Sequence, residues 1–370
     1  MTSKPYQKEL DLALKAVHRA SILTKKVQRQ GKDKGVSDKS DASPVTMADF
    51  GAQALLIGAL HDAFPDDVFV AEESSDILRA NSELLDRVWE LVTSVNDLDG
   101  LPLPSSKQDM VELIDLGSSG SKAAESGSER IWILDPVDGT KTFMTGNQYA
   151  VCLCLMEDGK QKVGVLGCPN LLYDTATPIV AEDIVDVDGN GLIVAAVAGQ
   201  GTFCAPLDSF ADENARTALK LNTVPPYPGT MRFIDSMASE HISKLHHERL
   251  YQRGFPDAPH RMGAINDILW PEDISAMQMK YIAIALNAAD ATFWIPADKE
   301  FYGSVWDHAG GQLILEEAGG VVTDSAGNRF VFSKGRRTFA GGNWGFVVAR
   351  SPEIHKFVLT EVQNLIKQGI

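Results

Sequence analysis

Hydrophobic and polar residues along the first 95 positions predict helices and one short strand. Apolar side chains recur at helical spacing over residues 6–30, with basic residues between them, which predicts an amphipathic helix. The polar, glycine-containing stretch 31–42 predicts a flexible loop. Residues 54–64 place apolar side chains on one helical face, and 77–95 follow the same spacing. Between these two helices, residues 68–75 predict a strand that runs into two glutamates.

The middle of the chain predicts an antiparallel sheet. Ile131–Leu134 is an apolar run suited to a buried strand, and a further run at 149–156 is followed by the hairpin-type turn Glu157-Asp-Gly-Lys and a returning strand. Short apolar pieces at 193–198 and 201–205 add two more strands. The polar and then proline-rich stretch 208–230 predicts a boundary between two parts of the chain.

The C-terminal part alternates between helices and strands. Helices are predicted over 237–249 and 275–289, followed by a strand at 291–295. A helix then begins near Asp307 and ends before paired glycines, and residues 321–324 predict a strand that leads into a tight turn.

Residues 97–130 differ from their surroundings because serine, glycine, aspartate and proline are frequent there. The composition of 117–128 buries too little apolar surface to order a segment by itself. We expect a mobile surface loop or lid beside the functional site.

Length and composition narrow the class of protein. The chain has 370 residues, which predicts two domains, and its 44% hydrophobic and 23% charged content is ordinary for a globular protein. A net charge of -16 disfavours nucleic-acid polymers and anionic membranes as partners. The four cysteines show no zinc or C-x-x-C spacing and are expected to be reduced and mostly buried. Without an apolar signal core or membrane-length segment, we expect a cytoplasmic protein.

The chemistry of the chain is concentrated after Ile131–Leu134. Pro136 removes a backbone donor and is expected to take the chain out of the sheet. Asp135 and Asp138 can then aim at one point, and hard oxygen ligands of this kind suit Mg²⁺. Gly139 permits close approach of the backbone to a ligand, and amides from Gly139 onward would point at an anion if a helix begins there. Asp-Gly is also a common turn pair, so an ordinary solvated turn is the alternative on these residues alone.

Other polar residues also have a structural interpretation beside a functional one. Asp49 falls where a helix is expected to begin, a position typical of a cap or dipole partner. Glu72 and Glu73 are adjacent, so only one of them can face a given site directly. For His246 and His247, surface histidines are favoured over a metal site because no other residue completes a transition-metal set.

Four separated motifs resemble the signature set of the inositol monophosphatase superfamily, the magnesium-dependent, lithium-sensitive phosphomonoesterases. In chain order they are Ser43-Pro-Val-Thr-Met-Ala-Asp, Val70-Ala-Glu-Glu-Ser, Ile133-Leu-Asp-Pro-Val-Asp-Gly-Thr and Trp306-Asp-His-Ala-Gly-Gly. The similarity runs from about residue 6 to the C-terminus. Within the superfamily the chain most resembles the 3'(2'),5'-bisphosphate nucleotidases, which remove the 3'-phosphate from 3'-phosphoadenosine 5'-phosphate.

The resemblance implies a set of metal ligands and two catalytic residues. Glu72, Asp135 and the backbone carbonyl of Val137 would hold one Mg²⁺. Asp135, Asp138 and Asp307 would hold a second, and a third, weaker ion would lie nearby. Asp49 and Thr140 match the positions that orient and activate the attacking water. A threonine hydroxyl suits this role because it can pass a proton to a carboxylate and still accept one.

The resemblance also implies the substrate contacts, where the chain departs from the pattern. Gly139, Thr140, His241 and Lys280 would face the substrate. At the family's serine position this chain has Met277, and at its arginine position it has Trp294. The loss of an arginine removes a forked phosphate donor, whereas a tryptophan could stack on a ring or fill core.

Three other interpretations follow from these residues. The same chemistry could act on an inositol phosphate or another small phosphorylated metabolite. A haloacid-dehalogenase-type phosphatase has a superficially similar Asp-x-Asp-Gly-Thr, but its aspartates are two apart and those of this chain are three apart. A non-catalytic sensor with the same fold is disfavoured because every carboxylate of the implied metal set is present.

The sequence thus predicts a layered α/β phosphatase with the inositol monophosphatase and fructose-1,6-bisphosphatase type of fold, in αβαβα layers. We expect an N-terminal α+β domain over 1–220 with most metal ligands and a C-terminal α/β domain over 221–370 with Asp307. The expected activity is Mg²⁺-dependent hydrolysis of the 3'-phosphate of 3'-phosphoadenosine 5'-phosphate, with its sulfated form as a further candidate substrate. A role in sulfur metabolism, lithium sensitivity, and a monomer or homodimer are further expectations from the resemblance.

Overall fold

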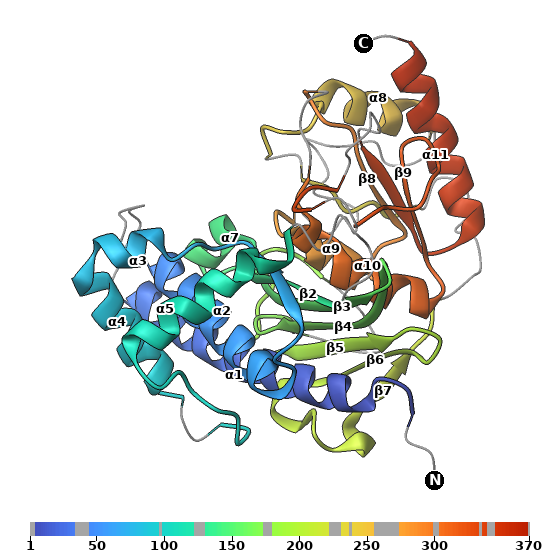
Figure 1. Ribbon diagram of the computed structural model, residues 1–370. Helices are drawn as coiled ribbons and strands as arrows, with labels where there is room; N and C mark the ends of the chain where they lie inside the picture. The colour runs from blue at the N-terminus through green and yellow to red at the C-terminus, as the bar shows by residue number, and fades with distance from the viewer. Residues whose placement is uncertain are drawn as a thin grey trace.

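The computed structural model of the chain describes residues 4–33, 44–95, 98–121, 130–172, 180–221, 231–236, 239–254, 274–298, 303–332, 335–338 and 345–368. Within these ranges a seven-stranded sheet and a three-stranded sheet are stacked with helices in alternating layers (Figure 1). None of the helices in these ranges is both long and apolar enough to cross a bilayer.

The larger sheet follows the order of the chain. Its strands are β1 (Val68–Ala71), β2 (Ile131–Asp138), β3 (Ala150–Glu157), β4 (Lys160–Cys168), β5 (Leu192–Val197), β6 (Gly201–Pro206) and β7 (Thr217–Leu219). The first two strands are parallel and every later pair is antiparallel. The predicted hairpin at Glu157-Asp-Gly-Lys is confirmed, because Asp158 and Gly159 have the positive φ angles of a tight hairpin turn.

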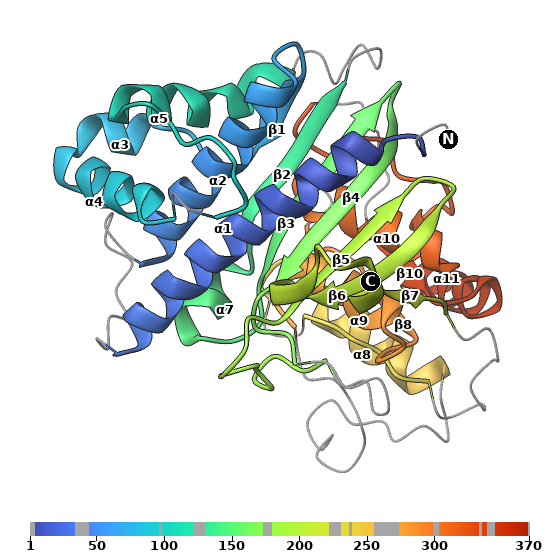
Figure 2. The ribbon, with the colours of Figure 1, turned by 90° about the horizontal axis from the view of Figure 1, so that it is seen from below.

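One face of this sheet is covered by the N-terminal helices. They are α1 (Gln7–Asp33), α2 (Pro44–Ala63), α3 (Asp76–Ala80), α4 (Ser82–Thr93), α5 (Lys107–Asp115) and the 3₁₀ turn η1 (Leu116–Ser121). Figure 2 shows α1 lying across the strands, with α3, α4 and α5 beyond α2. Because α2 packs on the sheet on one side and on α4 and α5 on the other, it is apolar nearly all round.

The opposite face of the sheet receives helices from the C-terminal part. These are α9 (Met277–Ala285) and α10 (Ala309–Ala318), the latter preceded by the 3₁₀ turn η5 (Val305–Asp307). Alternation along β2 separates the two cores: Trp132 packs with α1 and α2, whereas Ile133 packs with α9 and α10.

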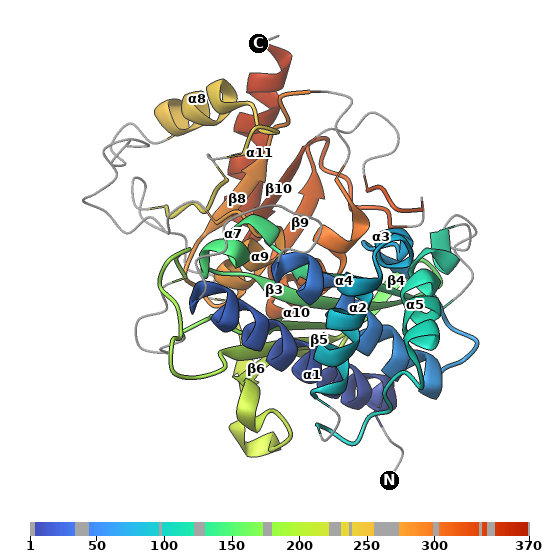
Figure 3. The same ribbon diagram turned by 90° about the vertical axis from the view of Figure 1, so that its left-hand side faces the viewer.

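A second, antiparallel sheet lies on the far side of α9 and α10 (Figure 3). Its strands are β8 (Ala291–Trp294), β10 (Phe346–Ala349) and β9 (Val321–Asp324), in that spatial order, and α8 (Lys244–Gly254) and α11 (Pro352–Lys367) pack on its outer side. The layers therefore run α, β, α, β, α, as the resemblance implied.

Short elements complete the described chain. They are α7 (Thr140–Thr145), η2 (Leu207–Ser209) and η3 (Glu213–Ala215). The division into domains at 1–220 and 221–370 stays a prediction. Helices α9 and α10 of the second range share a hydrophobic core with the large sheet of the first range. All four cysteines are buried and none forms a disulfide.

The expectation of a surface loop or lid over 97–130 is wrong for residues 107–121, which form α5 and η1. Helix α5 begins after Ser106, whose hydroxyl accepts a hydrogen bond from the Asp109 amide at 3.1 Å, and it buries Met110, Val111, Leu113 and Ile114. The following turn η1 packs on β1 so closely that a Cβ on Gly120 would lie 2.8 Å from the Phe69 carbonyl oxygen. The average composition of 97–130 is rich in serine and glycine, so it gave no indication of this one apolar helical face. Residues 122–129 lie outside the described ranges.

Three other expectations need correction. The predicted helix over 77–95 is split into α3 and α4 at Asn81, whose side chain caps α4. The helix predicted over 237–249 begins only at Lys244. Asp49 is not at a helix start, because α2 already begins at Pro44 and Asp49 lies in its second turn.

Candidate active site

A β-bulge in β2 brings Asp135 and Asp138 together. Asp135 pairs with Cys152 of β3 and Asp138 with Ala150, so three steps along β2 match two along its neighbour. Residues three apart in a regular strand face opposite sides, and one extra residue turns them to the same side. Pro136, which cannot donate to the ladder, lies inside this bulge. The expectation that Pro136 ends the strand is therefore wrong: the strand bulges there and continues to Asp138.

Asp307 completes an acidic cluster with these two residues. It is the last residue of η5, directly before α10, so its position comes from the opposite helical layer. One carboxylate oxygen from each of Asp135, Asp138 and Asp307 lies within 4.8 Å of the others. The cluster thus brings together side chains from residues 1–220 and from residues 221–370.

The electrostatics of the cluster favour a bound cation. Burial raises the pKa of Asp135, and the charges of Glu72 and Asp138 raise it further. Burial, Asp138 and Glu72 act in the same way on the pKa of Asp307. Burial raises the pKa of Asp138 to about 6, although hydrogen bonds from two backbone amides oppose the rise. Buried carboxylates that repel one another form a donor set suited to a hard divalent ion.

Those two amides belong to the first turn of α9. The Met277 amide donates to one oxygen of Asp138 at 3.0 Å, and the Gln278 amide donates to the other at 2.6 Å. Asp138 therefore acts as a cap for a helix that lies 139 residues further along the chain. A carboxylate oxygen has two lone pairs, so both oxygens retain acceptor capacity for a metal ion.

Of the two adjacent glutamates, Glu72 contacts the cluster. A hydrogen bond joins its carboxyl group to Asp135, while burial raises its pKa. Burial and the charge of Glu72 raise the pKa of Glu73 to about 7. The Arg336 guanidinium donates to the Glu72 backbone carbonyl at 3.0 Å and so attaches this loop to the C-terminal part of the chain.

Asp49 and Thr140 lie on different elements beside the cluster. Burial raises the pKa of Asp49, with smaller effects from Glu73 and Glu72, and the Asp49 charge in turn acts on Asp135. The exposed Thr140 begins α7, and its hydroxyl donates to the Val137 carbonyl at 3.5 Å. The described contacts thus pair Thr140 with Val137.

Gly139 has a steric reason to be glycine. Its φ of 97° lies in the left-handed region, and a Cβ there would lie 2.8 Å from both the Ala276 Cβ and the Thr142 hydroxyl. A helix does begin after Gly139, which was the condition for the amides from Gly139 onward to point at an anion.

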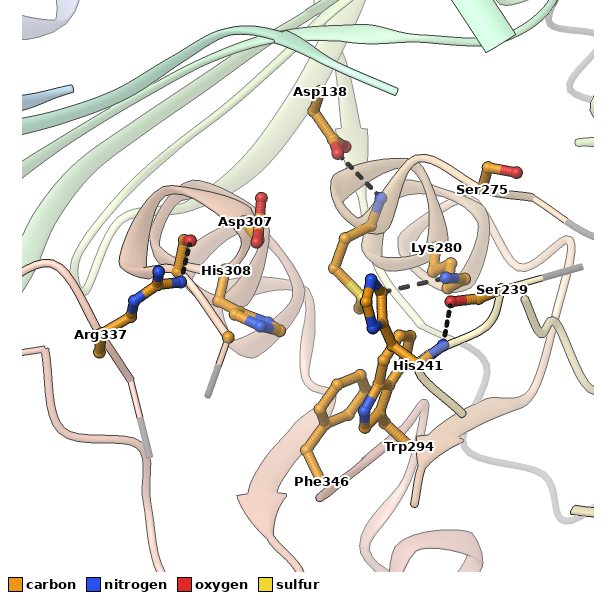
Figure 4. Close-up of a pocket in the computed structure, with 13 residues that line it drawn as sticks. Asp138, Ser239, His241, Ser275, Lys280, Trp294, Asp307, His308, Arg337 and Phe346 are labelled. Atoms are coloured by element: carbon orange, nitrogen blue, oxygen red, sulfur yellow. Dashed lines mark hydrogen bonds between the residues drawn. The ribbon is translucent and has the colours of Figure 1, made fainter. Parts of the chain in front are cut away.

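A cavity of about 260 Å³ adjoins the acidic cluster (Figure 4). Four residues expected in the site line it, and so do the two positions where the chain departs from the family pattern. They are Asp138, His241, Lys280 and Asp307, together with Met277 and Trp294.

Lys280 is a buried cation held in place in the cavity wall. Its ammonium donates to the Ser236 hydroxyl, and it lies 4.0 Å from the Met277 sulfur and 5.9 Å from the centroid of the Trp294 ring. Trp294 stacks on Phe346, with ring centroids 6.0 Å apart and an interplanar angle of 19°. Half-buried and facing the cavity, Trp294 is a wall residue of the site.

His241 reaches the cavity from the loop before α8. Its amide donates to the Ser239 hydroxyl at 3.2 Å, and its carbonyl accepts from the Ala297 amide at 2.9 Å. The exposed side chain faces the cavity (Figure 4).

Seven further residues, which were not among the predicted site residues, also line the cavity. These are Ser239, Ser275, Gly303, Ser304, His308, Arg337 and Phe346. Only His308, which follows Asp307 directly, had a signal in the sequence. It accepts or donates one hydrogen bond with the Tyr281 hydroxyl at 2.9 Å, and burial lowers its pKa to about 3, so it is neutral near pH 7.

His246 and His247 are not surface histidines, which corrects the expectation. Both are buried: His247 Nδ1 lies 2.7 Å from an Asp235 carboxylate oxygen, and its Nε2 accepts from the Ile295 amide at 3.2 Å. His246 hydrogen-bonds to Ser243. The two bonds of His247 satisfy both of its buried ring nitrogens, which indicates a structural role for this residue.

Comparison with known proteins agrees with this fold. The profile of the inositol monophosphatase family matches residues 6–367. The chain therefore belongs to the inositol monophosphatase family, and a phosphatase of this superfamily is the class that its fold and relatives support.

Several curated relatives have a more specific name. The chain is 40% identical over 374 residues to the 3'(2'),5'-bisphosphate nucleotidase of Emericella nidulans, covering 98% of this chain and 99% of that protein. It is 37% identical over 342 residues to the enzyme of the same name from Schizosaccharomyces pombe, covering 90% and 89%. The bisphosphate nucleotidase of Oryza sativa is 34% identical over 372 residues, covering 98% and 96%.

Solved structures share the fold at lower identity. SuhB of Mycobacterium tuberculosis has a TM-score of 0.55 at 18% identity, with 98% of both chains covered. CysQ of Bacteroides thetaiotaomicron, a bacterial member of the inositol monophosphatase family, has a TM-score of 0.53 at 15% identity, covering 94% of this chain and 98% of that one. These neighbours confirm the predicted fold class.

Proposed function

We propose that this chain is a Mg²⁺-dependent phosphomonoesterase that hydrolyses the 3'-phosphate of 3'-phosphoadenosine 5'-phosphate to adenosine 5'-phosphate and inorganic phosphate. The observation that carries the proposal is the junction of a buried acidic cluster with a cavity that contains Lys280, His241 and an aromatic wall. Relatives named bisphosphate nucleotidases over nearly the whole chain support it.

The proposed metal ligands fit hard divalent ions. Glu72, Asp135 and the Val137 carbonyl would hold one Mg²⁺. Asp135, Asp138 and Asp307 would hold a second, and the family resemblance implies a third, weaker ion nearby. The donor set is all oxygen. Burial and, after it, repulsion between the carboxylates raise the pKa values of Asp135 and Asp307, and a bound cation would offset both effects. When bound, Mg²⁺ supplies charge neutralisation for the phosphoryl oxygens and a lower pKa for coordinated water.

The reaction then depends on what the side chains do with water and substrate. A water oxygen attacks phosphorus, the bond between phosphorus and the 3'-oxygen breaks, and the leaving oxygen takes a proton. Asp49 accepts the proton of the water by way of the Thr140 hydroxyl. A proton acceptor of this kind works best with a pKa raised toward the working pH, and burial raises that of Asp49.

The remaining residues bind and orient the substrate. Backbone amides from Gly139 and Thr140 onward would donate to the scissile phosphate at the start of α7. Lys280 and His241 would contact the rest of the substrate from the cavity wall, where both side chains lie. The cavity would hold a small phosphorylated molecule and exclude a polymer.

A second candidate substrate class is an inositol phosphate or another small phosphorylated metabolite, acted on by the same chemistry. The observation that favours it is Trp294, an aromatic wall residue that cannot donate a forked pair of hydrogen bonds to a phosphate.

The test is phosphate release from 3'-phosphoadenosine 5'-phosphate, inositol 1-phosphate and inositol 1,4-bisphosphate, each with Mg²⁺ and with a chelator. We expect strong, Mg²⁺-dependent turnover of the nucleotide and at most weak turnover of the inositol phosphates. Preference for an inositol phosphate would refute the nucleotidase proposal in favour of the second candidate. Turnover that is unaffected by the chelator would refute the metal sites.

A further inference from the structure

Among the described residues, two cationic side chains line the cavity, and they come from different parts of the fold. Lys280 lies on α9, whereas Arg337 belongs to the short segment 335–338 and lies across the cavity from it in Figure 4. A substrate with two phosphates needs a positive partner for the second one, because Asp138 and Asp307 and the ions they would hold engage the first.

The wall around Lys280 does not offer a forked donor. Lys280 is 2% exposed, and its ammonium is bonded to Ser236 and lies near the Trp294 ring. An ammonium is a point charge, and an indole has a single N–H donor, so neither group can pair two parallel N–H bonds with a phosphate.

The segment 335–338 is attached to the cavity wall by backbone hydrogen bonds. Arg337 forms an isolated β-bridge with Ser304, the Thr338 amide donates to the Gly303 carbonyl at 2.9 Å, and the Val305 amide donates to the Arg336 carbonyl at 3.1 Å. These bonds fix the backbone of Arg337 beside η5, the turn that ends in Asp307.

The two arginines of this segment have different neighbours. The Arg336 guanidinium lies over the Trp306 ring, 4.4 Å from its centroid, and bonds to the Glu72 carbonyl. Arg337 instead lines the cavity, where its guanidinium donates to the Ser304 hydroxyl at 3.2 Å, and its side chain is exposed. Only Arg337 is therefore placed to meet a ligand.

We propose that Arg337 binds the second, non-scissile phosphate of a bisphosphorylated substrate and so makes this chain prefer bisphosphates over monophosphates. This inference rests on the proposed function, in which that group is the 5'-phosphate of the nucleotide. The planar guanidinium presents paired N–H donors that match two phosphate oxygens, and the Ser304 hydroxyl at 3.2 Å orients it. In this arrangement Arg337 supplies the forked donor that Trp294 cannot.

The test compares two substrates that differ only in the second phosphate. Steady-state kcat/KM is measured for 3'-phosphoadenosine 5'-phosphate and for adenosine 3'-phosphate, in the wild type and in Arg337→Gln. We expect the ratio of the two values to fall about 10- to 100-fold in the variant, the effect of losing a charge-assisted phosphate contact. Arg337→Lys keeps the charge without the fork and should recover part of the ratio.

Arg87→Gln is the matched control, because Arg87 is an exposed arginine on α4, outside the cavity, and the substitution changes the net charge equally. It should leave the ratio at the wild-type value. An Arg337→Gln ratio equal to that of the wild type, or an equal loss on both substrates, would overturn the inference. Thermal unfolding of each variant shows whether it is folded.

Binding of adenosine 5'-phosphate, measured by calorimetry, separates this inference from the proposed function. This ligand has only the second phosphate, so its affinity should fall about 10- to 100-fold in Arg337→Gln. Unchanged affinity would overturn the Arg337 contact even in an active nucleotidase. A wild type that hydrolyses neither nucleotide would refute the proposed function, and loss of adenosine 5'-phosphate binding in the variant would still support the contact.

Discussion

Replacing Asp135 with asparagine should stabilise the metal-free protein while abolishing its activity. Asparagine keeps an oxygen that can accept the hydrogen bond from the Val137 amide, 3.0 Å in the wild type, so the bulge is preserved. At 4.8 Å, the limit that encloses the three carboxylate oxygens, two unit charges repel by roughly 3 kcal/mol at an effective dielectric constant of about 20. Removing one charge should therefore raise the free energy of unfolding by roughly 3 kcal/mol, or the unfolding midpoint by roughly 5 °C.

The gain in the free energy of unfolding from Asp135→Asn should increase with pH. Burial and neighbouring charges raise the pKa of Asp135 in the folded state above its unfolded value. Below the unfolded pKa near 4, Asp135 is protonated in both states and does not lower the free energy of unfolding. As the pH rises toward the folded pKa, it lowers the free energy of unfolding more and more. The difference in stability between Asp135→Asn and the wild type should thus be large at pH 8 and small at pH 4.5.

The assay is thermal unfolding followed by circular dichroism, in chelator and in saturating Mg²⁺, at both pH values. Mg²⁺ should stabilise the wild type and have little effect on Asp135→Asn, which should also release no phosphate from the nucleotide. Asp66→Asn, at an exposed turn residue, is the control and should change stability by less than about 0.5 kcal/mol. The reasoning is refuted if Asp135→Asn is no more stable than the wild type in chelator at pH 8 and gains as much from Mg²⁺.

Further predictions concern the packing that supports the site. Gly311→Ala should destabilise the protein by about 1–3 kcal/mol in urea unfolding, because the new Cβ would lie 2.4 Å from the Gln278 side-chain oxygen; full stability would contradict the close packing. His247→Leu should cost about 3 kcal/mol because it removes the imidazole that pairs with the buried Asp235 carboxylate, and a smaller loss than Asp235→Ala would count against this pairing. Burial lowers the pKa of His355, so wild-type stability should fall as the pH drops below about 6.5, and equal slopes between pH 7.5 and 5 for wild type and His355→Gln would rule this out.

Local patterns in the sequence were enough to predict most long elements. The apolar spacing over 6–30 corresponds to α1, and the Asp158-Gly159 turn corresponds to the β3–β4 hairpin. Such patterns are reliable because each depends on the burial of one face or on the backbone freedom of one turn. Helix α5 was not predicted because its four buried residues lie within a region whose average composition is polar.

The acidic site was partly predictable for a different reason. Asp135 and Asp138 are close in sequence, so a bend near Pro136 was enough to expect that their side chains converge. The nature of that bend, an insertion of one residue within a continuous strand, depends on the pairing with β3 and has no local signal. The partner amides of Asp138 lie on α9, and only the tertiary fold brings them there.

Local sequence patterns did not predict the cavity wall that contains Arg337. Arg337 has no motif around it and reaches the cavity through a single bridge to Ser304. The burial of His247 likewise depends on Asp235 and on the Ile295 amide just after β8, which are distant in sequence. The metal, catalytic and substrate roles of the site residues stay predictions until variants are assayed.

The cap that Asp138 provides for α9 has a thermodynamic consequence. A metal ion bound at Asp138 withdraws electron density from the oxygens that accept the Met277 and Gln278 amides, so loading the ion must alter the free energy of those hydrogen bonds. The same helix places Met277 and Lys280 in the cavity wall. In the proposed function, ion affinity and substrate affinity would therefore be linked through one carboxylate. Because such linkage is reciprocal, a substrate that shifts α9 would change the affinity for the ion by the same factor. Relatives that differ along this helix would then differ in the ion concentration at which they work, even with every metal ligand unchanged.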